Sequence, residues 1–129
     1  MDVYLTWEAR EYLEGLALSN SGFDGILLGH KRGSEYYIEQ VFPYPDALSM
    51  TDERFNEINQ HFDDRVIGFY SFSFDKEITE KKLAPFSMGK IFLKIDTDKI
   101  KQLPLDSFFV DYDEKFRLKP NKVHYIEKD

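Results

Sequence analysis

The stretch that most constrains the fold is residues 65–75, where an apolar run leads into alternating serines and aromatics. Residues 66–70 are continuously apolar, which is typical of a strand covered on both faces. Ser71 and Ser73 follow and share one face, because strand side chains two residues apart point the same way. The opposite face carries Tyr70, Phe72 and Phe74. This stretch predicts a buried strand that ends in a polar surface groove.

The rest of the chain alternates strand and helix patterns around this stretch. Thr6 is a suitable N-cap for the first helix, and Ile26 to Leu28 predict a central strand buried on both faces. One buried helix stripe is predicted from Ala9, Tyr12, Leu13, Leu16 and Ala17. Strands are expected over 2–5, 23–30, 36–44, 66–74, 90–96, 107–112 and 122–127, helices over 7–19 and 49–62, and a loop or short helix over 75–85. The order predicts an α/β (α+β) fold with a mixed central β-sheet flanked by helices, in a single domain over 1–129.

Charge and composition narrow the classes of function. The net charge of −7 disfavours binding to phosphate backbones, so no nucleic-acid partner is expected. The absence of cysteine excludes disulfides, thiol nucleophiles and cysteine-type zinc sites. No apolar run is long enough to span a bilayer, and Met1 to Tyr4 do not begin a secretory signal, so we expect no membrane partner and a cytoplasmic location.

Three segments, taken in succession, resemble MPN domains, also called JAB or JAMM domains. Gly25 to Gly29 followed by a hairpin resembles their early strand, residues 66–70 resemble their metal-binding strand, and Lys90 to Asp96 resemble the core strand after it. The resemblance covers most of the chain in order and length. It implies an MPN/JAMM-like fold with cytidine-deaminase-like layering.

Active members of that family are zinc-dependent isopeptidases or peptidases that bind the metal through His-x-His and an aspartate. The family positions fall here on Ser71 and Ser73 for the histidines, Ala84 for the aspartate and Gly22 for the catalytic glutamate. The carboxylates nearest to the family's aspartate position are Glu77 and Glu80. Asp24 lies two positions away from the catalytic glutamate position. The family serine and proline fall on Lys81 and Phe74. Serine hydroxyls are poor zinc ligands, so the resemblance implies no metal, no cofactor and no catalytic residue.

Such a degenerate member is expected to act as a protein–protein interaction or scaffold module, in a homo- or hetero-oligomer. The alternative is a peptide or small-molecule site in the vacated groove, although Ser71 and Ser73 also fit an ordinary strand end. A third interpretation is an α+β domain whose strand order matches the family by chance. The histidines do not have the spacing of a metal ligand set or of a serine triad; they are His30, His61 and His124. Aromatic residues make up 16% of the chain, more than a small core readily hides. The candidate groove or interface residues are Tyr70, Phe74, Tyr36, Tyr37, Phe42 and Tyr44.

Overall fold

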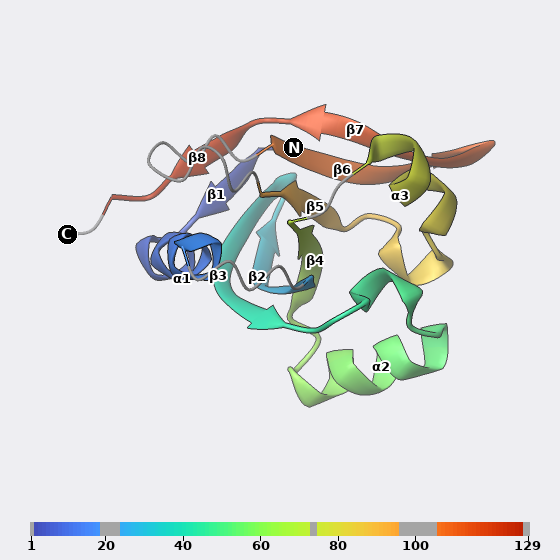
Figure 1. The fold of residues 1–129 in the computed structure, drawn as a ribbon, viewed down its shortest axis with the longest axis horizontal. Coiled ribbons are helices and arrows are strands. Elements are labelled where there is room, and N and C mark those ends of the chain that lie inside the picture. Colours follow the sequence, from blue (N-terminus) through green and yellow to red (C-terminus); the bar gives the residue numbers. More distant parts are fainter. Residues whose placement is uncertain (1, 19–23, 73–74, 96–105, 128–129) are drawn as a thin grey trace.

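The computed structural model describes residues 2–18, 24–72, 75–95 and 106–127, which form an α+β fold with one curled sheet and three α-helices (Figure 1). The strands are β1 (Val3–Leu5), β2 (Gly25–Arg32), β3 (Glu35–Pro43), β4 (Val66–Ser71), β5 (Ile91–Lys94), β6 (Asp106–Asp113), β7 (Lys115–Asn121) and β8 (Val123–Tyr125). The helices are α1 (Trp7–Leu18), α2 (Asp52–His61) and α3 (Lys76–Lys82), with 3-10 turns η1 (Ala47–Ser49) and η2 (Pro85–Ser87).

The sheet has eight strands in the order β7-β6-β5-β4-β2-β3-β1-β8. The pairs β1–β3, β1–β8 and β4–β5 are parallel, and the other pairs are antiparallel, so the sheet is mixed as predicted. Strands β7 and β8 follow each other in the chain, and Figure 1 shows them along one side of the molecule. Since they occupy opposite ends of the strand order, the sheet must curl.

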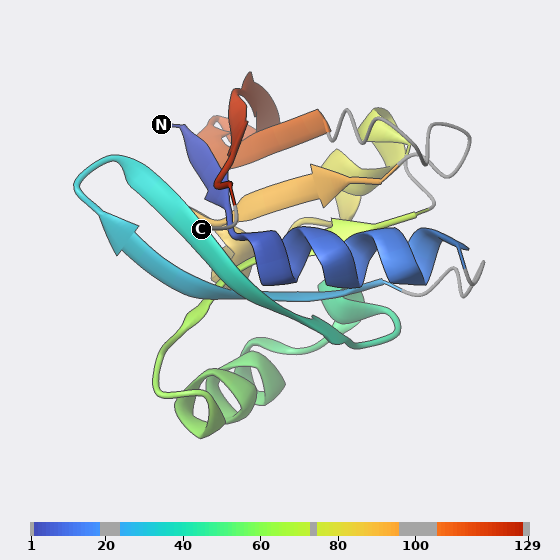
Figure 2. The same cartoon turned by 90° about the vertical axis from the view of Figure 1, so that its left-hand side faces the viewer.

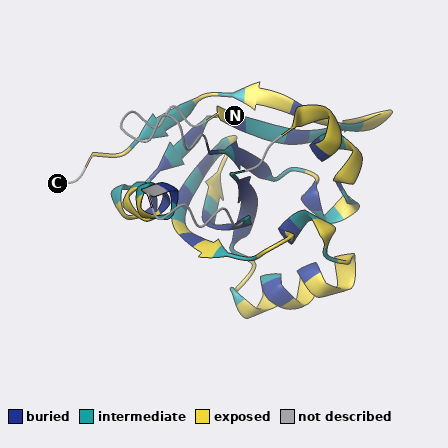
Figure 3. Ribbon diagram, viewed as in Figure 1, coloured by how far each residue is buried: buried dark blue, intermediate teal, exposed yellow. Residues whose placement is uncertain are grey.

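The central strands are buried on both faces, which confirms the interpretation of the two apolar runs. On one face Leu27, Ile67 and Leu93 pack with α1. On the other face Ile26 and Phe69 pack with the α2 side chains, including Phe55 and Ile58. Figure 2 shows α1 alongside the β2–β3 hairpin, and Figure 3 shows buried strands at the centre of the sheet and a mainly exposed α2 with a few buried positions. Both helices therefore bury one stripe each, as the periodicity predicts.

Helix termini follow their capping residues. Thr6 Oγ1 accepts a hydrogen bond from Ala9 N at 3.3 Å, which confirms the predicted cap of α1. The predicted start of the second helix at Ser49 is wrong, because Thr51 is extended and caps α2 by accepting a hydrogen bond from Arg54 N. Tyr12 was expected in the buried stripe of α1 but is 46% exposed, since it lies at the margin of that stripe.

Two predictions about strands are wrong. Segment 115–121 is β7, although Pro120 and Asn121 predicted a turn there. An edge strand tolerates proline, because an N–H group that points away from the sheet is not needed for pairing with the neighbouring strand. In β3, strict alternation placed Phe42 on the same face as Tyr36 and Ile38. A β-bulge opposite the Leu28/Gly29 step inserts one residue, so the side chains after Glu39 change faces. As a result Val41 is buried and Phe42 is exposed.

Candidate functional site

The position that the family resemblance assigns to the first metal histidine holds a short hydrogen bond. Strands β2 and β4 are antiparallel with Gly25 opposite Tyr70, which brings Asp24 beside Ser71. Ser71 Oγ donates to Asp24 Oδ1 at 2.7 Å. Ser71 is 5% exposed, so the prediction that it lies in a surface groove is wrong. The sequence signal was present, because Asp24 directly precedes the Gly25–Gly29 run, but only the strand register joins the two side chains.

A small polar cavity surrounds this pair. Asp46 and Ser49 border it at η1, and Thr79 and Lys82 border it from α3. Its volume is about 60 Å³, room for a few water molecules, whereas small-molecule sites occupy roughly 300–1,000 Å³. The cavity therefore favours a site closed by its own side chains over a ligand pocket.

Tyr70 lines the cavity from β4 but is itself a core residue. Its ring packs against Gly25 so closely that a Cβ atom there would lie 2.3 Å from the ring, so residue 25 must be glycine. Burial raises the pKa of the Tyr70 hydroxyl well above its ordinary value, and Tyr12 and Asp24 add to the rise. The hydroxyl is therefore a neutral, buried group and not a surface contact.

Of the other positions taken from the metal site, the structure describes Ala84. Ala84 is a half-buried residue that directly precedes η2, and Gly22, Ser73 and Phe74 lie outside the described residues. Within the described ranges, no group of three or more His, Cys, Asp or Glu side chains is placed to hold a metal ion. His30 Nδ1 lies 2.6 Å from Glu39 and His124 Nε2 lies 2.8 Å from Asp2, so each of these histidines is paired with its own carboxylate.

The aromatic hairpin is divided between core and surface. Tyr36 is 2% exposed and therefore cannot serve as an interface residue on the surface. Tyr37 is half-buried and stacks between Tyr4 and His30, with ring centroids 5.0 and 5.2 Å away. Phe42 is 46% exposed, so only part of this predicted surface lies in the open.

Phe42 separates two apolar grooves. Its ring centroid lies 5.4 Å from that of Phe62, and both side chains line both grooves. The first groove, about 380 Å³, continues over Tyr44, and the second, about 450 Å³, continues over Tyr12 on α1. Arg54 Nε donates to Tyr44 Oη at 3.4 Å, which holds this ring at the edge of α2.

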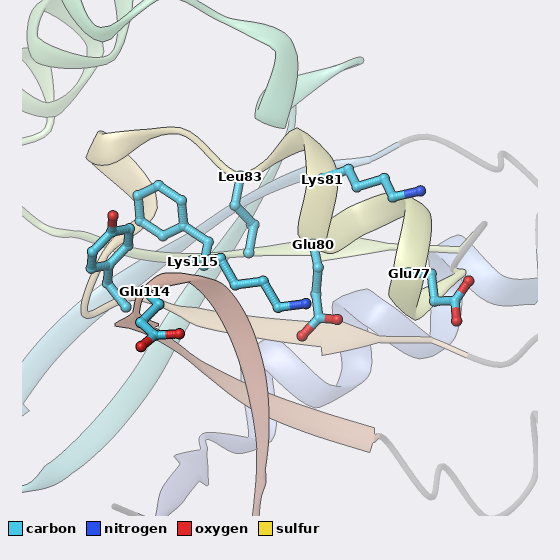
Figure 4. A pocket seen from close by; sticks show the side chains of 8 residues that line it. Glu77, Glu80, Lys81, Leu83, Glu114 and Lys115 are labelled. Carbon is cyan, nitrogen blue, oxygen red and sulfur yellow. The ribbon is translucent and has the colours of Figure 1, made fainter.

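A further groove of about 660 Å³ lies between α3 and the β6–β7 hairpin, and the sequence did not single it out. Figure 4 shows Glu77, Glu80 and Lys81 extending from α3, and Glu114 and Lys115 from the hairpin. Its apolar floor includes Leu83, Tyr112 and Phe116. The alternation of Phe116 and Leu118 was the signal that could have revealed the hairpin.

Comparison with known proteins supports the fold and assigns no activity. No protein-family model matches the sequence, and no curated protein matches it. The chain is similar to the solution structure of protein DSY2949 from Desulfitobacterium hafniense, with 15% identity and a TM-score of 0.68 over 98% of this chain and 94% of that chain. In the described ranges, no helix is both long enough and apolar enough to cross a membrane. The two chains share an α+β fold.

Proposed function

We propose that this chain is a non-catalytic MPN-like domain that acts through protein–protein contacts. The observation that carries the proposal is the Ser71–Asp24 hydrogen bond, which lies where the resemblance expects a zinc-binding histidine. A serine hydroxyl and one carboxylate satisfy each other there and leave no set of imidazoles for zinc. The pair connects the start of β2 to the end of β4 and so has a structural role.

The order of elements supports the same family. The chain runs β–α–β–β–α–β before the segment that carries α3. The segments that resemble the family follow one another in this order. The cavity at Ser71 is small, whereas the grooves beside Phe42 are larger and lie at the surface. Exposed aromatic side chains next to apolar grooves are typical anchors of protein interfaces. Contacts are therefore proposed at the outer surface and not at the former metal position.

Zinc titration of the full chain tests this proposal. After treatment with EDTA, the native protein is expected to bind no stoichiometric zinc by calorimetry and to leave an isopeptide-linked peptide uncleaved. The double variant Ser71→His/Ser73→His restores the two imidazoles and is expected to bind zinc at least about tenfold more tightly than the native chain. Ser71→Ala/Ser73→Ala is the matched control, and circular dichroism verifies that each variant folds.

Two results would count against the proposal. One equivalent of zinc on the native protein together with cleavage of the isopeptide would show an active enzyme. A folded histidine variant that gains no zinc affinity would show that Ser71 and Ser73 do not occupy the family's metal positions.

A further inference from the structure

We infer that the surface around Phe42 and Phe62 docks a segment of a partner protein that presents two large apolar side chains beside a lysine or arginine. This inference rests on the proposed function, since it names the kind of partner that the domain would bind. The surface consists of the two grooves and the aromatic ridge between them, and we call it the Phe42 surface.

The ridge offers two adjacent sites for apolar side chains. Phe42 extends from the end of β3, and Phe62 follows α2 directly. Because both rings line both grooves, a side chain on each side of the ridge would contact both rings. Grooves of about 380 and 450 Å³ are large enough for an aromatic or aliphatic anchor each.

The exposed apolar area explains why a partner would be favoured there. Phe42 and Tyr12 are each 46% exposed, although each borders buried residues such as Val41 and Ala9. Removing apolar surface from water contributes roughly 25 cal/mol per Å². Phe42 and Tyr12 are the exposed large hydrophobic side chains among the residues that line this groove, so they are the expected anchors.

The charges around the Phe42 surface favour a basic partner. The second groove is lined by two charged side chains, Glu8 and Glu39, and both are carboxylates. Glu39 already pairs with His30 and lies 3.5 Å from Arg65, whereas Glu8 is exposed and has no ion pair among the described residues. Glu8 can therefore accept a lysine or arginine from a partner segment.

The first groove does not offset the negative charge of the Phe42 surface. Arg54 lies at its wall, but its guanidinium already bonds to Glu57 Oε2 at 3.1 Å. The whole chain carries a net charge of −7, which steers basic partners toward it. In a two-fold contact between copies of this chain, this acidic surface would face an identical acidic surface, which disfavours a second copy as the occupant.

Peptide binding to the full chain tests the inference. The probe is a fluorescein-labelled amphipathic peptide of leucine and lysine, compared with a peptide in which glutamate replaces every lysine at unchanged leucine positions. Fluorescence anisotropy is expected to show binding of the lysine peptide only, with an affinity that falls as salt is added. Phe42→Ser is expected to weaken binding about tenfold, and Glu8→Gln about threefold.

Matched controls separate this surface from general attraction to an acidic protein. Tyr112→Ser and Glu114→Gln remove an exposed ring and a carboxylate at the groove of Figure 4, and each should leave the affinity unchanged. Equal binding by the glutamate peptide, equal loss in the control variants, or no effect of Phe42→Ser would overturn the inference. So would self-association that Phe42→Ser abolishes in sedimentation experiments. None of these outcomes alters the zinc result, so the two proposals can fail separately.

Discussion

At the scale of single residues, Lys90 places a charge beside the aromatic core. Its Nζ lies 5.7 Å from the ring centroid of Phe55, which belongs to the buried cluster under α2. Burial lowers the pKa of Lys90 and Lys31 lowers it further, whereas Asp64 raises it. The lowered pKa means that folding disfavours the protonated ammonium.

Replacing Lys90 by methionine is therefore expected to stabilise the protein at neutral pH. Methionine keeps the unbranched apolar chain against Phe55 and removes the buried charge, while the lost cation–π contact offsets only part of the gain. A gain of about 1 kcal/mol would raise Tm by roughly 2–8 °C. The exposed Lys76→Met is the control, with no change expected.

The pH dependence supplies a second readout. In the native protein, stability should rise as pH increases from the lowered folded pKa of Lys90 toward the unfolded value, because the unfolded chain binds more protons in that interval. Lys90→Met should remove this alkaline increase. A Tm that falls on substitution, with the alkaline increase intact, would contradict the assignment.

Residue patterns predict environment better than contact. The apolar run at 66–70 correctly predicts burial on both faces, but β4 ends at Ser71 and is shorter than the strand expected over 66–74. The hydrogen bond from Ser71 to Asp24 was not predicted, because it depends on the register between β2 and β4. A pattern of period two says which face a side chain occupies but not which residue lies opposite.

At the scale of elements, β7 is an edge strand whose outer side is protected. Leu118 N donates to Glu80 Oε2 of α3 at 2.7 Å, and Pro120 has no N–H to offer. An unprotected edge would present free backbone groups to another chain. These two features reduce the number of free N–H groups on the outer side of β7, and this edge position explains why a proline occurs in a strand that the sequence did not predict.

Glu80→Ala is expected to expose this edge. The loss of a hydrogen bond to a carboxylate should cost about 1–2 kcal/mol of unfolding free energy, measured in urea. The exposed N–H should also increase light scattering on storage at high concentration. Glu80→Gln retains an acceptor oxygen and should show less of both effects, and Glu77→Ala in the same helix should behave like the native protein. Equal results for Glu77→Ala and Glu80→Ala would argue against edge protection.

At the scale of the whole molecule, the curl of the sheet brings distant segments together. Val3 N donates to Lys122 O at 2.9 Å, so the N-terminal strand meets the junction between β7 and β8. Tyr36 in β3 contacts Phe109 in β6, with ring centroids 6.3 Å apart, although three strands separate β3 from β6 in the sheet order. Sequence patterns predicted a mixed sheet with a central strand at 23–30 but not this curl, because the curl depends on contacts between residues far apart in the chain.

One hydrogen bond spans the curled sheet and is open to a direct test. Tyr36 Oη donates to Gly89 O at 2.7 Å, and Gly89 N donates to Val110 O at 2.9 Å, so the glycine joins β3 to the β5–β6 pair. Gly89 has φ +77°, a conformation that other residues rarely adopt, which fixes its carbonyl toward Tyr36. Tyr36→Phe keeps the buried ring and leaves that carbonyl without its donor.

We expect Tyr36→Phe to lower the unfolding free energy by about 1–2 kcal/mol, because the Gly89 carbonyl loses its donor beside Tyr36, which is only 2% exposed. The slope of free energy against urea should stay unchanged, since the fold and its buried area are retained. Tyr37→Phe is the matched control: its hydroxyl donates to Glu35 Oε2 at 3.0 Å on the half-buried face, where water can replace it, so a change within about 0.5 kcal/mol is expected. If Tyr36→Phe were as mild as Tyr37→Phe, the bond to Gly89 would not contribute to holding the curled sheet together.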